Sequence, residues 1–415
     1  MVNLMKIKYS SIQWFLSCFI ILWLNAGNFE YIQGFFPQAI KFGLVFIWFL
    51  MTASIYKGFL KLYLSKVAPI LIMIAIIMLS KAFGNERYFN LYGMHYVYYA
   101  IIFAVFVCGF YFYKERESKA LLIVLISDIS IVAVHTFIEL SRNPILVRAM
   151  STGADARLNL LDGVIPKGVG GYGMCYQLVF LGMLLVLLLG RKIRDRIWIY
   201  LSEIFIFLLL FSSQITLALI MQVVGIAAVL LFRSDRKSFI GKIFFLVILI
   251  ILLLNLGSIL RYLISNAGDD MAKRLEELLG IRDISAESSG DIASRYRLYE
   301  KSFLSFLQNP FWGDFGGEGI GCHSTFIDLL GAYGMLGIFG IIGVLNPFRM
   351  MFKYFESRSV KNNLLLFYIM MIVLATINVL IGSDVMLATT VMVPLFFKVL
   401  YGHEDYYENY RDQHD

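Results

Sequence analysis

A polar stretch that runs into an apolar one carries the side chains best suited to chemistry. Residues 316–337 read GGEGIGCHSTFIDLLGAYGMLG, so His323 stands where the polar stretch ends. A histidine titrates near neutral pH and can take a proton from a hydroxyl group. Arg295 and Tyr299 lie upstream, four residues apart, which places them on the same side of a helix. The alternative roles of His323 are to cap the following helix or to contact a lipid headgroup.

The composition of the chain indicates what must position these residues. Of the 415 residues, 59% are hydrophobic and only 16% are charged, against about 25% in a typical soluble domain. The mean hydropathy is +0.75. Apolar runs of roughly 17–25 residues, enough to cross a bilayer, recur along the chain, and a backbone in lipid must be helical. We therefore predict an all-α integral membrane protein.

About twelve apolar segments are predicted to be transmembrane helices. They are residues 10–24, 38–56, 67–80, 96–113, 119–138, 173–190, 197–212, 215–232, 243–263, 324–345, 363–381 and 385–401. Three or four Lys or Arg residues occur in each of the connections 57–66, 114–119, 191–196, 233–242 and 349–361. The connections 25–40, 213–214 and 382–384 contain none. Because Lys and Arg accumulate on the cytoplasmic side, both termini are predicted to be cytoplasmic.

The predicted organisation is a membrane bundle with one large external subdomain. Its parts are residues 1–263 with spans 1–9 and an external loop at 139–172, residues 264–323 as the large external loop, residues 324–401 with spans 10–12, and residues 402–415 as a cytoplasmic tail. Within the large loop we expect helices over 269–280 and 292–309. The second helix has an apolar face with Tyr296, Phe303 and Leu307 and a polar face with Arg297, Lys301 and Ser305. We expect it to lie along the outer membrane interface.

The order of several short elements resembles the carboxyl-terminal block of the O-antigen polymerase/ligase superfamily. The elements are Arg295-x-x-x-Tyr299, then NPFWGDFG at 309–316, then His323 followed by TFIDLLGAYGMLG with its glycine pair Gly334 and Gly337. Residues 295–340 carry this resemblance. Two other stretches are similar to the family less closely. ARLNLLDGVIPKGVGGYG makes Arg157 the counterpart of a family arginine, and LLLFSSQITLALI has Gln214 where the family commonly has arginine.

The resemblance implies a GT-C-like membrane glycosyltransferase in the bacterial inner membrane. It implies transfer of a growing glycan from undecaprenyl pyrophosphate to the next lipid-linked repeat of an O-antigen or capsular polysaccharide, at the outer face of that membrane. Arg295 and Arg157 would then stabilise the charge of the leaving pyrophosphate, and His323 would take the proton of the acceptor hydroxyl. Further substrate contacts are expected from Arg297, Arg148, Tyr299 and Gln214.

The resemblance also implies a set of partners. Lipid-linked oligosaccharide would serve as donor and acceptor, and a flippase and a chain-length regulator are expected beside membrane lipid. No cofactor and no nucleic acid are expected. No metal ion is expected either, because the outer loops contain no cluster of Asp, Glu and His with the spacing of metal ligands.

Two other functions are consistent with the sequence. A ligase would hand the finished polymer to lipid A–core and would present the same donor site. A transporter is the alternative of another class, because Asp128, His135 and Glu139 share one face of a predicted span, where ionisable residues are functional by default. The lack of internal repeats and the long external loop favour glycosyl transfer. Cys175 and Cys322 fall near one face, which leaves a disulfide between them open.

Overall fold

The chain folds into a helical bundle. The computed structural model describes residues 9–25, 31–32, 34–147, 150, 166–190, 193–232 and 291–411, and these ranges contain helices and no strand. The α-helices are α1 (Tyr9–Leu24), α3 (Gln38–Ile55), α4 (Phe59–Ala82), α5 (Met94–Val107), α6 (Glu115–Arg142), α9 (Tyr172–Leu187), α10 (Ile193–Ser212), α11 (Thr216–Phe232), α15 (Asp291–Gln308), α16 (Thr325–Tyr333), α17 (Ile338–Tyr354), α18 (Arg358–Ile377), α19 (Ser383–Leu387) and α20 (Val393–Arg411). The π-helical turns η1 (Phe89–Gly93), η2 (Cys108–Phe112) and η7 (Ala388–Met392) and the 3-10 turns η4 (Leu188–Gly190) and η6 (Gly334–Gly337) adjoin them. The all-α prediction is confirmed for the described residues.

Several helical runs are long and apolar enough to cross a membrane, as expected of a multi-pass membrane protein. In the described ranges seven qualify: Gln38–Ile55, Phe59–Ala82, Phe89–Phe112, Glu115–Arg142, Thr325–Tyr354, Arg358–Ile377 and Asp384–Gly402. Helices α1, α9 and α11 are apolar but shorter, with 16, 16 and 17 residues. Each predicted segment inside the described ranges overlaps a helix, but the segment 324–345 covers two, α16 and the first part of α17, with the turn η6 between them. The segment 243–263 lies outside the described ranges.

Helix α4 begins earlier than the sequence pattern indicates. The predicted span starts at residue 67, but the helix starts at Phe59 and includes Lys61 and Lys66. Phe59, Tyr63 and Val67 are buried and recur every four residues, so one face packs against the bundle while the two lysines lie off that face. The apolar repeat extends through the basic connection, and a boundary drawn from charge alone is too late by about two turns.

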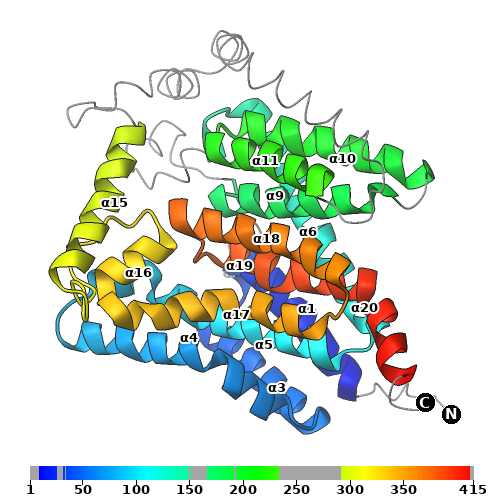
Figure 1. Ribbon diagram of the computed structural model, residues 1–415, viewed down its shortest axis with the longest axis horizontal. Helices are drawn as coiled ribbons and strands as arrows, with labels where there is room; N and C mark the ends of the chain where they lie inside the picture. The colour runs from blue at the N-terminus through cyan, green and yellow to red at the C-terminus, as the bar shows by residue number, and fades with distance from the viewer. Residues whose placement is uncertain are drawn as a thin grey trace.

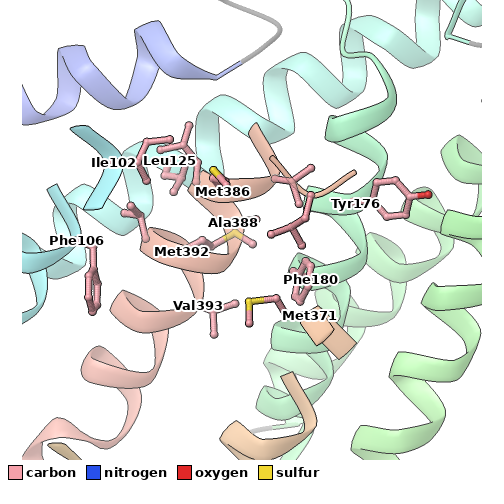
Figure 2. Packing of buried hydrophobic residues seen from close by; sticks show 14 of the residues in the cluster. Ile102, Phe106, Leu125, Tyr176, Phe180, Met371, Met386, Ala388, Met392 and Val393 are labelled. Carbon is pink, nitrogen blue, oxygen red and sulfur yellow. The ribbon is translucent and has the colours of Figure 1, made fainter. Parts of the chain in front are cut away.

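The centre of the bundle is packed around the broken helix formed by α19, η7 and α20. Figure 2 shows Met386 and Met392 between Ile102 of α5 and Phe180 of α9, and all four side chains are buried. The ring of Tyr176 joins this cluster from α9, while its hydroxyl points away from the labelled apolar side chains. The core therefore fixes the ring of a tyrosine whose oxygen is available for polar contacts.

Helix α15 has a different direction from the spanning helices. In Figure 1 it runs crosswise past the ends of α17 and α4. Tyr296, Phe303 and Leu307 are 61%, 53% and 55% exposed on its outer side. The sequence pattern groups Ser305 with Arg297 and Lys301 on the polar face, but Ser305 does not share the exposure of these two residues. Ser305 is buried and its hydroxyl donates to the Gly331 carbonyl at 2.9 Å, because a glycine in α16 lets the two helices approach closely.

The two ends of the bundle are formed by different sets of connections. The end that carries α15 includes the connections 83–88, 309–324 and 378–382, and we call it the α15 end. The N–H of Tyr88 donates to the Gly316 carbonyl at 3.1 Å, and the N–H of Thr325 donates to the Asn378 carbonyl at 3.0 Å. The opposite end, where α4 begins and α17 stops, contains several of the Lys-rich and Arg-rich connections and is called the basic end.

Candidate functional site

The two halves of the motif block contact each other at the α15 end. The turn 309–316 follows α15 and packs against the end of α16. The contacts are backbone hydrogen bonds from the N–H of Asp314 to the Gly331 carbonyl (2.9 Å), from Gly316 to Ala332 (3.0 Å) and from Met335 to Pro310 (2.8 Å). Gly334 has a φ of 57°, and a Cβ there would overlap the Pro310 carbonyl oxygen. The first glycine of the pair is therefore required by this turn.

A buried set of polar contacts holds α15 on α16. The Ser302 hydroxyl donates to Asp328 Oδ1 at 2.6 Å and accepts from the Gly321 N–H at 2.7 Å. Asp328 Oδ2 accepts from the Ser324 N–H at 2.8 Å, and Ser324 Oγ accepts from the Ile327 N–H at 3.1 Å. This reciprocal pattern caps the first turn of α16. The backbone on both sides of His323 is therefore fixed by buried hydrogen bonds.

His323 is exposed at this fixed turn. Its Nδ1 lies 2.9 Å from the carbonyl oxygen of Cys322. Because a carbonyl only accepts, this contact requires the tautomer with hydrogen on Nδ1, which leaves the lone pair of Nε2 available as a base. The alternative in which His323 caps α16 is not supported, since Ser324 is the N-cap residue and its side chain makes the capping bond.

Backbone strain is present at the same turn. Cys322 has a φ of 62°, a left-handed conformation that costs a non-glycine residue roughly 1–2 kcal/mol. In the described residues the other non-glycine positions with positive φ are Gln214 (58°) and Phe315 (47°). All three lie in stretches that carry the family resemblance. Strain of this kind persists where the surrounding structure enforces it, and it clusters at active sites.

Two cations act on Cys322, the residue before His323. Arg87, from the connection after α4, forms an ion pair with Glu318 and also acts on the thiol of Cys322. The charge of Lys301 also acts on this thiol. Burial raises the pKa of Cys322, and the hydrogen bond from Arg87 lowers it in part. Arg87 reaches the site only because the α4 end packs against the motif block, a contact that no local spacing indicates.

Arg295 and Tyr299 lie one turn apart on α15, as their spacing predicts. They share a hydrogen bond, and the charge of Arg295 also acts on the hydroxyl of Tyr176 in α9. The Tyr299 hydroxyl donates to the Ile377 carbonyl at 2.5 Å. Burial raises the pKa of Tyr299, while Arg295 lowers it. This part of the site therefore joins α15, α9 and the end of α18.

An asparagine outside every motif completes the cluster. Asn378 follows α18, and its Nδ2 donates to the hydroxyl oxygens of both Tyr172 and Tyr176 at 2.6 Å. Tyr176 in turn donates to Tyr172 at 2.9 Å. The hydrogen of the Tyr172 hydroxyl has no acceptor among the residues that the structure describes, so it is available to a ligand oxygen. Sequence analysis assigned none of these three residues to the site. Tyr172 lies at the end of the quoted stretch ARLNLLDGVIPKGVGGYG, whereas Tyr176 and Asn378 lie in apolar stretches that carry no motif.

Gln214 occupies the tight turn between α10 and α11. Its side chain is buried, with Nε2 lying 3.4 Å from the Pro144 carbonyl oxygen. Its Oε1 has no hydrogen-bond partner among the described residues. The neighbouring Ser213 acts on the thiol of Cys175, which precedes Tyr176 in α9. The turn is thus attached to the same helix that carries the tyrosine pair, and it supplies a polar acceptor without charge.

The remaining predicted arginines are Arg148, Arg157 and Arg297. Arg148 and Arg157 lie outside the described residues, as does the helix expected over 269–280. Arg297 is exposed on α15, away from Ser302 and Ser305, which face α16.

The ionisable residues of α6 contact three different groups. Asp128 accepts from the Asn25 amide at 2.7 Å, His135 Nδ1 lies 3.1 Å from the Gly168 carbonyl oxygen, and Glu139 pairs with Arg142 at 2.7 Å. Each side chain thus serves a local polar link. Cys175 and Cys322, the candidates for a disulfide, are both free thiols.

Within the described residues, no group of three or more His, Cys, Asp or Glu side chains is arranged to hold a metal ion.

The chain was also compared with known protein families and with curated proteins. No family model matches the chain, and no curated protein matches it by sequence.

Proposed function

We propose that the chain is a membrane glycosyltransferase that extends an O-antigen or capsular polysaccharide. The observation that carries this proposal is the assembly at the α15 end. Arg295 with Tyr299, the turn 309–316 and His323 come from separate parts of the motif block and meet on one platform formed by α15 and α16. The platform stands where apolar helices end and exposed loops begin, so a membrane-held donor and a water-borne sugar both reach it.

In the proposed reaction the hydroxyl of an acceptor sugar attacks the anomeric carbon of the donor glycan. The bond from that carbon to undecaprenyl pyrophosphate breaks, and its electron pair leaves with the pyrophosphate oxygen. The proton of the attacking hydroxyl passes to Nε2 of His323. The planar guanidinium of Arg295 binds two pyrophosphate oxygens and stabilises the charge that grows on the leaving group.

Tyr172 supplies a second donor to the same anion. Its oxygen accepts hydrogen bonds from Asn378 and from Tyr176, at 2.6 Å and 2.9 Å. Accepting two hydrogen bonds polarises the hydroxyl and strengthens it as a donor. The hydroxyl lies beside Tyr176, on which the charge of Arg295 acts, so guanidinium and phenol can contact one pyrophosphate. We assign to Tyr172 the role of binding a phosphate oxygen that Arg295 does not reach.

The wider arrangement belongs to the same proposal. It comprises twelve spans in a GT-C-like bundle, cytoplasmic termini, and α15 at the outer surface of the bacterial inner membrane. The crosswise direction of α15 and its exposed Tyr296, Phe303 and Leu307 support a position in the membrane interface. A flippase that delivers lipid-linked repeats and a chain-length regulator are the partners that this reaction needs.

Between polymerase and ligase we favour the polymerase. Both enzymes take the same donor, so the motif block does not separate them. The uncharged Gln214 stands where the family commonly has arginine, and this departure favours the polymerase branch. The transporter alternative has less support, because Asp128, His135 and Glu139 are engaged in separate contacts.

Reconstitution of the full chain in liposomes with undecaprenyl-pyrophosphate-linked repeat units tests this proposal. A polymerase produces a ladder of lipid-linked polymer from these units alone. Transfer that occurs only after lipid A–core is added identifies a ligase instead. Movement of the lipid-linked unit across the bilayer without any new glycosidic bond identifies a transporter, and either result removes the polymerase assignment.

A further inference from the structure

A cavity at the basic end lies between α4 and α17, on the opposite end of the bundle from α15. Its volume is about 190 Å³. It is lined by Ser65, Lys66, Pro69, Tyr111, Ile342, Asn346, Arg349, Met350 and Lys353. Drug-sized ligands fill pockets of about 300–1,000 Å³, so this volume suits a group as small as a phosphate and excludes a sugar repeat.

The lining of this cavity is cationic. Lys66 comes from α4 and Arg349 and Lys353 come from α17, and no Asp or Glu takes part in the lining. The ion pairs of the described residues join Arg87 to Glu318 and Arg142 to Glu139. Within this part of the chain, the three cations therefore lack a carboxylate partner. An anion in the cavity would supply one.

A neighbouring cavity shows that a position at the basic end is not sufficient to make an anion-binding site. It has a volume of about 350 Å³ and contains Lys114 and Lys398. The ammonium of Lys398 already donates to the carbonyls of Gly109 and Tyr113, at 3.0 Å and 2.8 Å. Glu115 also lines that cavity and offsets one positive charge. The smaller cavity has neither of these features, so it is the stronger anion site.

The walls of the smaller cavity are held by direct contacts between α4 and α17. The Asn346 amide donates to the Lys66 carbonyl at 2.5 Å. One turn away, a Cβ on Gly343 would lie 2.7 Å from Cγ1 of Ile70, so the glycine allows the two helices to touch. The cations consequently project from two helices whose spacing is fixed.

The face of α17 that carries these cations becomes apolar towards the middle of the helix. Lys353, Arg349, Asn346 and Ile342 follow one another at intervals of three or four residues, which aligns them on one side. Ile342 is 39% exposed, and Ile338 one turn further is 42% exposed. This side of α17 is therefore charged near the end of the helix and apolar towards its middle, in the same order as the headgroup and acyl chain of a lipid.

We propose that this cavity binds the headgroup phosphate of an anionic phospholipid, with an acyl chain along Ile342 and Ile338. Three cations that form no ion pair among the described residues match a phosphate, and basic pockets between spanning helices are known to hold lipid headgroups. A free phosphate would satisfy the same cations, but it would leave the apolar continuation uncovered. The site is independent of the glycosyl-transfer proposal and lies on different side chains.

Native mass spectrometry of the full chain in detergent, titrated with phosphatidylglycerol, tests the site. The double variant R349Q/K353Q removes two cations, each worth about 1 kcal/mol near a membrane surface, so we expect about 30-fold weaker binding. K61Q/K361Q removes the same charge from the same end outside the cavity and should leave the affinity nearly unchanged. R349K/K353R keeps the charge and should restore binding, which separates loss of the site from loss of the fold.

Three results would overturn the proposal. Equal weakening in R349Q/K353Q and K61Q/K361Q would show that only the overall surface charge matters. Phosphatidylcholine binding as tightly as phosphatidylglycerol would remove the role of the cations in selecting an anionic lipid. Displacement of phosphatidylglycerol by inorganic phosphate at equal concentration would identify a free-anion site and exclude the acyl-chain contact.

Discussion

The α15 end and the basic end both contain cations, but they hold them in different ways. At the α15 end, Arg295 contacts Tyr299, and Arg87 contacts Glu318 and the Cys322 thiol. At the basic end, Lys66, Arg349 and Lys353 line a cavity without a carboxylate partner among the described residues. Charge that develops on one leaving oxygen needs donors fixed in advance. A lipid headgroup that is only retained needs net charge and a cavity of suitable size.

The largest expected effect comes from His323, the proposed base at the α15 end. His323→Gln keeps the size of the side chain but removes its ability to take a proton, so polymer formation should fall by roughly 10²–10⁴-fold. Polymer length on gels and the rate of lipid-linked transfer measure this loss. Ser324→Ala is the matched control, because it removes the helix cap at a cost of about 1 kcal/mol and leaves the base in place. A full ladder from His323→Gln at equal protein level would return this residue to a structural role.

A smaller effect is expected from the guanidinium. Arg295→Lys keeps the charge but loses the planar fork, and we expect about 10²-fold slower transfer, as when one donor to a developing oxyanion is lost. Arg142→Lys is the comparison, since Arg142 pairs with Glu139 at 2.7 Å on the same helix and lysine can replace it there. If both variants transfer glycan equally well, Arg295 acts only as a surface charge, and the contrast between the two ends disappears.

The third prediction concerns the close packing that positions the α15 end. A Cβ on Gly331 would lie 2.5 Å from the Ser302 carbonyl oxygen, whereas Gly43 in α3 has nothing within 4 Å of such a carbon. Gly331→Ala should therefore destabilise the protein by about 1–3 kcal/mol through overpacking. Gly43→Ala should be neutral or stabilising, because alanine is the better helix former. Unfolding by denaturant in mixed micelles measures both, and equal stability would show that α15 docks loosely on α16.

The smallest expected effect tests whether Arg87 belongs to the site. Arg87 lowers the pKa of Cys322, so Arg87→Gln should raise that pKa further and reduce the fraction of thiolate at any given pH. Alkylation of Cys322 by a maleimide should then be slower, and its pH profile should shift to higher pH. The other three cysteines are buried and should react slowly in both proteins. If the alkylation rate of Cys322 is unchanged in Arg87→Gln, Arg87 does not act on the Cys322 thiol. Arg297→Gln serves as the control for the loss of one positive charge.

The sequence predicts the helices better than it predicts the site. Apolar periodicity locates the segments that coincide with helices, because burial in lipid or in the core acts over many residues. It misplaces the start of α4, where Phe59 and Tyr63 continue the buried face through a Lys-rich stretch. It also groups Ser305 with the exposed Arg297 and Lys301, because residue spacing alone does not indicate the close approach of Ser305 to Gly331.

Sequence reasoning could propose candidate site residues only where a motif is local. Arg295, Tyr299 and His323 lie in one stretch, and their order gives the family resemblance. Arg87 and Asn378 come from the two sides of that stretch and carry no motif of their own. They reach it through the packing of α4 and through the turn after α18. Contacts of this kind depend on the fold as a whole, so no window of the sequence indicates them.

The position of Asn378 beyond the motif block predicts the effect of a truncated gene. The motif block ends at residue 340, yet the carbonyl that holds Tyr299 belongs to Ile377, and the amide that orders Tyr172 and Tyr176 belongs to Asn378. A premature stop codon after residue 357 would leave every motif codon intact. The product would nevertheless lack one wall of the site and should behave as a null allele. Complementation by a second fragment that begins at Arg358 should restore function only if it retains Asn378.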